Sequence, residues 1–287
     1  MDPIRVISII LTICIAISCT FLAKSEKIRH FAEQLSNLKQ ISYSQMINNT
    51  VSFDSSIKLL SGKLMIYPIK NKNYLFDFSA KYKLNQVRPQ ITFSNNQNLA
   101  KLSIKQNELK IYGLLSRSRW NLGLNPHIIN NLKIETVSAK EICNLSGLKI
   151  KNLSVKTVSG LVTISFFEDN PIIMDTFIFK ATESSNCTLK GLLRSRAKKI
   201  AIFCNGGNLL LDFSGQLLIP TEVQINGNVK KIKIIIPKGI NTTIFVPNLK
   251  KIKVNVTNLI KEGEFTFTNT EFNPLFSSLK INLLINT

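Results

Sequence analysis

Two similar phrases follow one another in the middle of this sequence of 287 residues. The phrase "LKIETVSA" begins at Leu132, and "LSVKTVSG" begins at Leu153. Each alternates apolar and polar residues and ends in small residues that favour turns. A short unit repeated in this way is typical of stacked β-coils, because no single unit can bury its own apolar face. The stretch Leu132–Phe166 therefore constrains the fold more than any other part of the chain.

The repeat predicts which apolar side chains face inward. Within the stretch these are Leu132, Ile134, Leu148, Ile150, Leu153, Val155, Val162, Ile164 and Phe166. Equivalent strand positions, spaced about twenty residues apart as in solenoid coils, are expected at Ile134, Val155, Ile178, Ile202, Ile225 and Ile244. Upstream, period-2 alternation predicts two strands around a turn at Ser61-Gly62 and a strand at Tyr74–Tyr82. The predicted class is all-β, a solenoid of stacked short strands.

The N-terminal part predicts a membrane anchor. Val6–Ala23 carries no charge and approaches the roughly 20 apolar residues that a spanning helix needs. We therefore expect a transmembrane signal anchor at 1–23 and, because apolar residues recur at helical spacing, an amphipathic stalk helix at 24–41. An alternative is cleavage before Cys19, or lipidation of that cysteine. The remainder, 42–287, is the predicted β-rich domain, with a first layer at 42–118 and repeat coils at 119–287.

The orientation of this anchor has two opposing indications. Lys24, Lys27 and Arg29 follow the apolar run, and the positive-inside rule would then place the C-terminal bulk in the cytoplasm. Strand-rich, Asn- and Thr-rich domains behind one N-terminal segment are more typical of exported proteins. We predict a single-pass protein of the cell membrane whose β domain is extracytoplasmic.

Three stretches carry a family resemblance. These are "WNLGLNP" from Trp120, Asn144–Gly160, and the "IxIPxG" phrase around Ile234–Gly239. They resemble the toast-rack and "putative adhesin" domains of bacterial membrane-anchored envelope proteins. The resemblance runs from about Ser52 to the C-terminus and implies a rack of short strands stacked as a β-solenoid. Val137-Ser138-Ala139 departs from it, since a glycine pair would be usual there. The resemblance implies no set of binding residues.

The best candidate for a functional surface is electrostatic. Lys+Arg number 37 against 17 Asp+Glu, a net charge of +20 that favours anionic partners. The phrase Lys-Lys-Ile occurs three times, and stacking would align the three pairs in a basic ladder with two arginines nearby. The predicted residues are Arg194, Arg196, Lys198, Lys199, Lys230, Lys231, Lys250 and Lys251. The alternative is that these lysines keep strand edges soluble and prevent edge-to-edge pairing.

Nothing in the sequence predicts a catalytic residue, a metal site or a cofactor. Neither His30 nor His127 has a second histidine or a carboxylate at ligand spacing. Cys143, Cys187 and Cys204 have no zinc spacing and are expected to be buried thiols, although one pair could bridge in an oxidising compartment. The only tryptophan, Trp120, is predicted to be a core plug over the open end of the apolar stack.

The predicted function is that of a non-enzymatic, membrane-anchored envelope protein, a scaffold or interaction module in envelope sensing or adhesion. Its expected partners are the membrane through the N-terminal helix, anionic lipid or an envelope polymer, and another membrane protein. One alternative is a carbohydrate-active solenoid enzyme that uses the acids Asp54, Asp77 or Asp212. The other is nucleic-acid binding, which only the charge suggests and which requires a cytoplasmic domain.

Overall fold

The computed structural model describes residues 38–83, 88–106, 118–183, 185–247, 259–269 and 277–285. The predicted anchor at 1–23 lies outside these ranges. Within them, no helix has the length and apolarity needed to cross a membrane. The described part of the chain is all-β, as predicted, apart from one short 3-10 helix, Leu193–Ser195.

The strands are short in some coils and long in others. Their bounds are β1 (Leu38–Met46), β2 (Ser52–Pro68), β3 (Tyr74–Lys83), β4 (Gln90–Asn96), β5 (Leu99–Lys105), β6 (Arg119–Leu124), β7 (Ile129–Asn144), β8 (Ile150–Ser165), β9 (Met174–Ala181), β10 (Ser185–Lys190), β11 (Ala197–Asn205), β12 (Asn208–Asp212), β13 (Thr221–Asn228), β14 (Lys231–Ile235), β15 (Thr242–Phe245), β16 (Leu259–Lys261), β17 (Thr266–Asn269) and β18 (Leu279–Ile285). The last four residues of the predicted stalk, 38–41, begin β1, so the stalk helix is wrong there.

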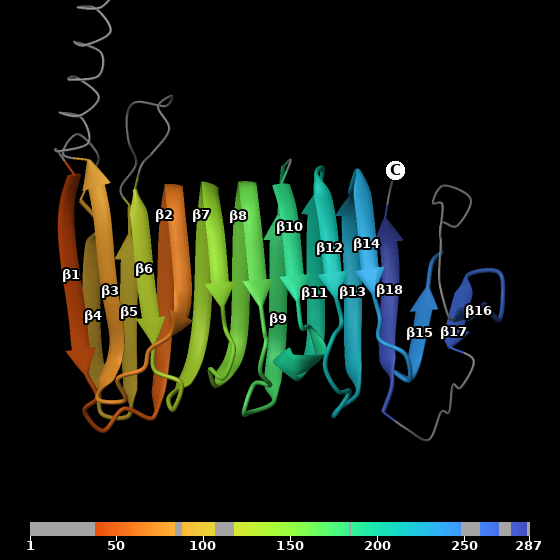
Figure 1. Ribbon diagram of the computed structural model, residues 1–287, viewed down its shortest axis with the longest axis horizontal. Helices are drawn as coiled ribbons and strands as arrows, with labels where there is room; N and C mark the ends of the chain where they lie inside the picture. The colour runs from red at the N-terminus through yellow and green to blue at the C-terminus, as the bar shows by residue number, and fades with distance from the viewer. Residues whose placement is uncertain are drawn as a thin grey trace, which may run out of the picture.

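Two facing layers enclose the core (Figure 1). Layer A contains, side by side, β4, β5, the first halves of β2, β7 and β8, then β9, β11, β13, β18, β15, β17 and β16. Layer B contains β1, β3, β6, the second halves of β2, β7 and β8, then β10, β12 and β14. Phe53 on layer A stacks on Phe76 of layer B, with ring centroids 5.5 Å apart.

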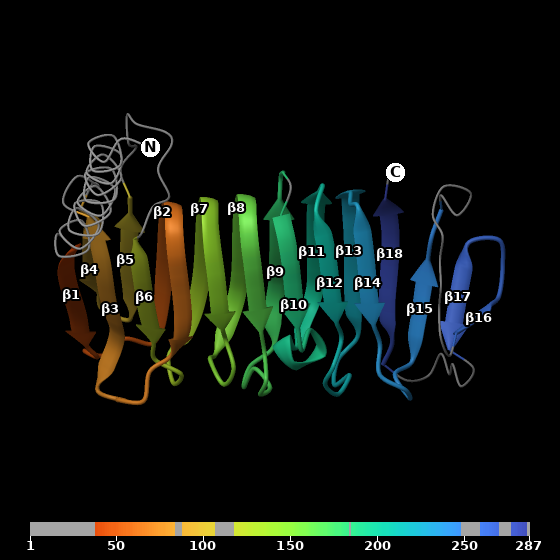
Figure 2. The same cartoon turned by 45° about the horizontal axis from the view of Figure 1, so that its top comes forward.

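The two layers meet at two different edges. At one edge, the upper edge in Figure 1, β2, β7 and β8 bend directly from layer A to layer B, and short links join β9 to β10, β11 to β12 and β13 to β14; we call it the corner edge. At the other, longer loops such as 166–173 and 191–196 return the chain to layer A; we call it the loop edge. Figure 2 shows both layers with the corner edge brought forward.

The corner edge corrects the predicted turns. The expected turn at Ser61-Gly62 is wrong, because β2 runs through it as a single strand of 17 residues. The repeated phrases behave alike: β7 and β8 continue through their small residues and bend from one layer to the other. Gly62, Ala139, Gly160 and Ser185 are in register along this corner. Gly207 lies beside Ser185 in the next coil. Small residues therefore mark a corner rather than a strand end.

Register settles which predicted positions are equivalent. All nine inward candidates between Leu132 and Phe166 are buried, which confirms them. In layer A, Ile134, Val155, Ile202 and Ile225 are aligned, but Phe179 takes the place predicted for Ile178. Ile178 points outward and is 46% exposed. Ile244 pairs with Ile281 of β18, one row away from the predicted column.

The order of strands in space differs from the order in sequence at both ends. β2 lies between the pair β5 and β6 on one side and β7 on the other. The predicted first layer, 42–118, and the predicted coils, 119–287, therefore share one continuous stack. At the far end, β18 is inserted between β13 and β15 and is parallel to both.

Close backbone packing at the corner gives a test of the fold. A Cβ on Gly207, whose φ is +69°, would lie 1.8 Å from the carbonyl oxygen of Ser185, whereas a Cβ on Gly239, at φ +77°, would meet nothing within 4 Å. Both alanine variants bear the left-handed backbone cost, about 1 kcal/mol. We expect Gly207→Ala to lower the free energy of unfolding by at least about 2 kcal/mol more than Gly239→Ala, measured by urea unfolding with Trp120 fluorescence. Equal losses in the two variants would contradict the close packing of the corner.

Candidate functional site

The structure does not bring the predicted lysine pairs together as one ladder. Lys199 aligns with Glu222 of β13, near the loop edge. Lys231 aligns with Asn208 of β12, at the corner edge, and Lys230 immediately precedes it. The described pairs thus lie at opposite ends of their coils, so the predicted alignment is wrong for them. Lys250 and Lys251 lie outside the described residues.

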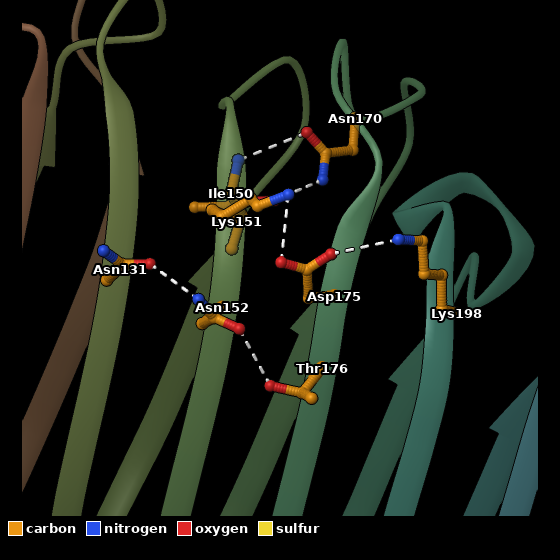
Figure 3. A network of polar contacts seen from close by, with 8 residues as sticks. All are labelled: Asn131, Ile150, Lys151, Asn152, Asn170, Asp175, Thr176 and Lys198. Carbon is orange, nitrogen blue, oxygen red and sulfur yellow. Dashed lines mark hydrogen bonds and ion pairs between the residues drawn. The ribbon is translucent and has the colours of Figure 1, made fainter.

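Predicted basic residues at the loop edge have local partners. Arg194 Nη1 lies 3.6 Å from Asp169 Oδ1, and Lys198 Nζ lies 3.4 Å from Asp175 Oδ1. Lys151 Nζ is 3.0 Å from the other oxygen of Asp175, and its hydrogen bond holds the pKa of that carboxyl below its usual value (Figure 3). Arg196 Nη1 donates to the carbonyls of Asn170 and Pro171, both at 3.3 Å. Three of the predicted basic residues, Arg194, Arg196 and Lys198, therefore have acceptors nearby.

The corner edge carries basic rows that the sequence did not predict. In layer A, one outward row runs across adjacent strands through Lys105, Lys58, Glu135, Lys156 and Lys180. In layer B, the corresponding row runs through Lys81, Arg119, Lys63 and Lys140. Among the described residues, no ion pair involves a basic member of either row. Glu135, the one acid in these rows, is bound by Lys133 at 2.9 Å, which lowers its pKa.

A groove of about 600 Å³ lies on the outer face of layer A, towards the loop edge. It crosses β4, β5, β2, β7, β8 and β9, and its lining is rich in short polar side chains. The side chains that point outward along it include Ser56, Thr92, Ser94, Lys101, Ser103, Asn131, Lys133, Asn152, Ser154, Thr176 and Ile178. The hollow forms where adjacent strands carry small side chains, and longer side chains border it.

A hydrogen-bonded ladder forms one side of the groove. Asn131 Nδ2 donates to Asp54 Oδ1 at 2.8 Å, and Asn152 Nδ2 donates to Asn131 Oδ1 at 3.0 Å. Thr176 Oγ1 then donates to Asn152 Oδ1 at 3.0 Å (Figure 3). Each residue comes from the next strand of the stack, so register alone creates the ladder. The bonds fix these side chains in place and leave the second oxygen of Asp54 and the second amide protons of the asparagines for other partners.

The carboxylates proposed for a carbohydrate-active enzyme are not brought together. Asp54 points outward from layer A, whereas Asp77 and Asp212 lie on layer B, six strand intervals apart and thus separated by roughly 29 Å. Asp212 accepts hydrogen bonds from the backbone and hydroxyl of Ser214. Paired carboxylates of a glycosidase lie within about 10 Å of each other, so this alternative is contradicted. In the described ranges, no three His, Cys, Asp or Glu side chains gather as metal ligands.

Trp120 is buried, as predicted, but it is not a lid. It is 1% exposed and packs edge-on against Phe78, with ring centroids 5.7 Å apart. Strands β3 and β1 extend layer B beyond the β6 strand that carries it. It therefore fills the core near one end of the stack without closing that end.

A buried acid, Glu141, is the titratable group that the sequence analysis missed. It is fully buried on β7, aligned with the apolar Leu64 and Val162 of neighbouring strands. Burial raises its pKa to about 7, against the lowering effect of hydrogen bonds with Thr136 and Thr157. The alternation of β7 could have revealed this burial, because Glu141 lies midway between Ala139 and Cys143, whose side chains also point inward.

Two threonine hydroxyls near Glu141 lower its pKa and so act against the effect of burial. Thr136 Oγ1 contacts both Glu141 Oε1 and, at 2.9 Å, Thr157 Oγ1. Thr157 uses its own proton to donate to the Ser159 carbonyl at 3.2 Å. Thr136 is within donor distance of both Glu141 and Thr157, and its single proton can go to only one of them at a time.

The three described cysteines are buried free thiols, as expected. Cys143 lies on the same strand as Glu141, and burial raises the pKa of its thiol well above the ordinary value. Cys187 and Cys204 share a hydrogen bond that raises the pKa of the Cys187 thiol. Raised pKa values keep Cys143 and Cys187 protonated and unreactive at neutral pH.

A family comparison agrees with this geometry. Residues 32–172 match the family described as "N-terminal domain of toast_rack, DUF2154". The chain therefore contains a toast-rack domain, as the resemblance implied. The match covers β1–β8 and the loop after β8, and it includes the corner and the groove strands except β9. No curated protein matches the chain.

Solved structures with some likeness come from bacteria. A "putative cell adhesion protein" from Clostridium sporogenes is 18% identical, with a TM-score of 0.44 and coverage of 87% of this chain and 96% of that one. A "putative adhesin" from Bacteroides fragilis is 12% identical, with a TM-score of 0.24 and coverage of 68% and 92%. We draw nothing on function from likenesses at this level.

The raised pKa of Glu141 predicts a pH dependence of stability. Its folded pKa of about 7 exceeds the ordinary 4.5, so its contribution is fully present below pH 4.5 and is lost as pH rises through 7. The shift corresponds to about 3 kcal/mol as an order of magnitude. We expect Glu141→Gln to be more stable than the unmutated protein at pH 8.5 and to lose this part of the pH dependence, measured by urea unfolding between pH 4 and 8.5.

A matched control for Glu141→Gln is Glu222→Gln, which changes an exposed glutamate on β13. Its unfolding curve should follow that of the unmutated protein across the same pH range. If Glu141→Gln and the unmutated protein kept the same pH dependence, Glu141 would be ionised in the folded state.

Proposed function

We propose that this chain is a non-enzymatic, single-pass protein of the cell membrane, whose stacked coils form an extracytoplasmic interaction module of the envelope. The observation that carries the proposal is the groove on the outer face of layer A. Its polar side chains come from successive strands and are held by hydrogen bonds to one another, an arrangement suited to holding a ligand. The apolar run at Val6–Ala23 supports the anchor, and the toast-rack domain supports a place in the envelope.

The groove favours an extended, polar ligand. It crosses six strands, and at about 4.8 Å per strand interval it is roughly 24 Å long. Hydroxyl, amide and lysine groups line it, whereas Asp54 is its only acid. A segment of envelope polymer, with hydroxyls and amides spaced along a chain, offers the complementary donors and acceptors. We infer that the groove binds such a polymer without cleaving it.

Membrane anchoring is tested on the full chain. We expect it to stay in the membrane fraction after alkaline carbonate extraction, because an apolar run of this length needs detergent for release. A reporter at the C-terminus that is active only outside the cytoplasm should give a signal. Release by carbonate would contradict the anchor, and a cytoplasmic reporter signal would contradict the orientation.

Polymer binding is tested by filling the groove. Ser154 lies on the groove floor, and Ala201 is exposed in the same outward row two strands further along, beyond the groove. We expect Ser154→Trp to weaken cosedimentation of the detergent-purified chain with peptidoglycan by about tenfold, the effect of about 1.4 kcal/mol. Ala201→Trp should bind as the unmutated protein does. If the unmutated chain does not sediment with peptidoglycan, or if both variants bind equally, the groove has another role.

A further inference from the structure

We propose that the corner edge is a lipid-contacting surface, on which the stack of coils lies along a membrane of anionic headgroups. This inference rests on the anchor of the proposed function and adds the orientation of the β domain. It concerns the two corner rows, Lys58, Lys105, Lys156 and Lys180 in layer A and Lys63, Lys81, Arg119 and Lys140 in layer B. The edge opposite to the loops would then face the headgroups, and the groove would remain accessible.

The corner rows form a line of positive charge along the stack. Register places Lys81, Arg119, Lys63 and Lys140 on four adjacent strands, about 4.8 Å apart. Across the corner, Lys105 and Lys58 are direct neighbours, as are Lys156 and Lys180. Such a row repels itself and lowers the stability of the sheet. Because the described residues supply no matching row of acids, an external anionic surface is the natural complement.

The acids of the described chain gather at the other end of the coils. Asp169 and Asp175 form ion pairs there, and Glu168 and Asp212 also lie in or beside the loops. Near the corner edge of the coils from β2 to β12, the described acids are Glu135, the buried Glu141 and, in the link between β9 and β10, Glu183; Glu262 and Glu264 lie in the turn between β16 and β17. Exposed apolar side chains occur at both edges, for example Phe167 by the loops and Leu161 by the corner. Charge, rather than apolarity, therefore distinguishes the two edges.

The point at which the described chain begins supports the same orientation. β1 starts at the corner edge, because Gln40 pairs with Lys81 and Lys81 pairs with Arg119. Residues 24–37 separate this start from the apolar run Val6–Ala23. Even fully extended, that segment spans at most about 50 Å, so the start of β1 and the corner residues beside it stay within that distance of the end of the apolar run. Tethering of this kind favours many weak charge contacts that would not hold a free protein.

The shape of the edge favours a membrane over a small ligand. The groove lies on the outer face of layer A, and no residue of the corner rows lines it. Lys133, which pairs with Glu135, borders it. A line of long basic side chains, of which only Lys58 and Lys63 are half-buried, fits a flat surface whose anionic groups can rearrange beneath it. These contacts are screened within about 10 Å at 0.1 M salt and should therefore weaken as salt is added.

The test is lysine footprinting on the full chain in nanodiscs. One set contains only phosphatidylcholine, and the other also contains phosphatidylglycerol; both are treated with a water-soluble acetylating reagent and analysed by mass spectrometry. We expect Lys58, Lys63, Lys140 and Lys156 to react about threefold more slowly in the anionic nanodiscs at low salt, with the difference lost at 0.5 M salt. Lys70 and Lys72, exposed near the loop edge, serve as internal controls and should react equally in both.

A second readout uses the only tryptophan, which adjoins Arg119 at the corner edge. Energy transfer from Trp120 to a headgroup-labelled lipid should be higher in anionic than in neutral nanodiscs. The triple variant Lys63→Gln, Lys140→Gln, Lys156→Gln should lose this increase, whereas Lys70→Gln, Lys72→Gln, Lys149→Gln should keep it. An unchanged urea midpoint shows that the triple variants remain folded.

The outcomes separate this inference from the anchor. A chain that does not enter neutral nanodiscs contradicts the anchor and, with it, the inference. A chain that enters both kinds of nanodisc, with equal reactivity of the corner lysines and equal energy transfer, contradicts the inference alone. If single-stranded DNA protects the corner lysines at the same salt and anionic lipid does not, the edge binds nucleic acid and the inference is overturned.

Discussion

The whole structure depends on the in-register pairing of each coil with the next. The backbone groups of one coil find their partners on its neighbours, and the apolar side chains of one coil are covered only when the next is in place. The same pairing aligns side chains of like position into rows. Buried rows form the core, as with Ile134, Val155, Ile202 and Ile225. Outward rows form the ladder of the groove and the basic lines of the corner edge.

Local alternation predicted the core correctly, but it did not predict the corners. The inward residues between Leu132 and Phe166 follow from a period of two, which a single strand reveals. Ser61-Gly62 gives the same local signal whether the chain reverses or bends from one layer to the other. Only the pairing of β2 with both layers of β7 distinguishes the two. The prediction for Ile178 was wrong by one residue because the loops between coils differ in length, and these lengths set which residues of adjacent coils align.

The sites depend more strongly on distant residues than the core does. Composition predicted a basic surface, but Lys105, Lys58 and Lys156 come from separate parts of the sequence, and only register makes them one row. The groove ladder from Asp54 to Thr176 arises in the same way. Asn170, in the loop after β8, is fully buried and donates to the carbonyls of Ile150 and Ser195. Its amide thus links Ile150, at the start of β8, to Ser195, in the 3-10 helix, and nothing local in the sequence predicts this contact.

Two strands, β2 and β18, lie between strands that do not adjoin them in the sequence, and this affects how the stack forms during synthesis. β2 emerges early, yet the strands on both of its sides come after it, so the stack grows outward from β2 in two directions. Further along the stack, β13 and β15 are joined through β18, which follows both of them in the sequence. Until then both strands carry open hydrogen-bonding edges, which invite pairing with other chains. Synthesis of β18 thus covers these edges, and a chain that stops before β18 would be prone to aggregate.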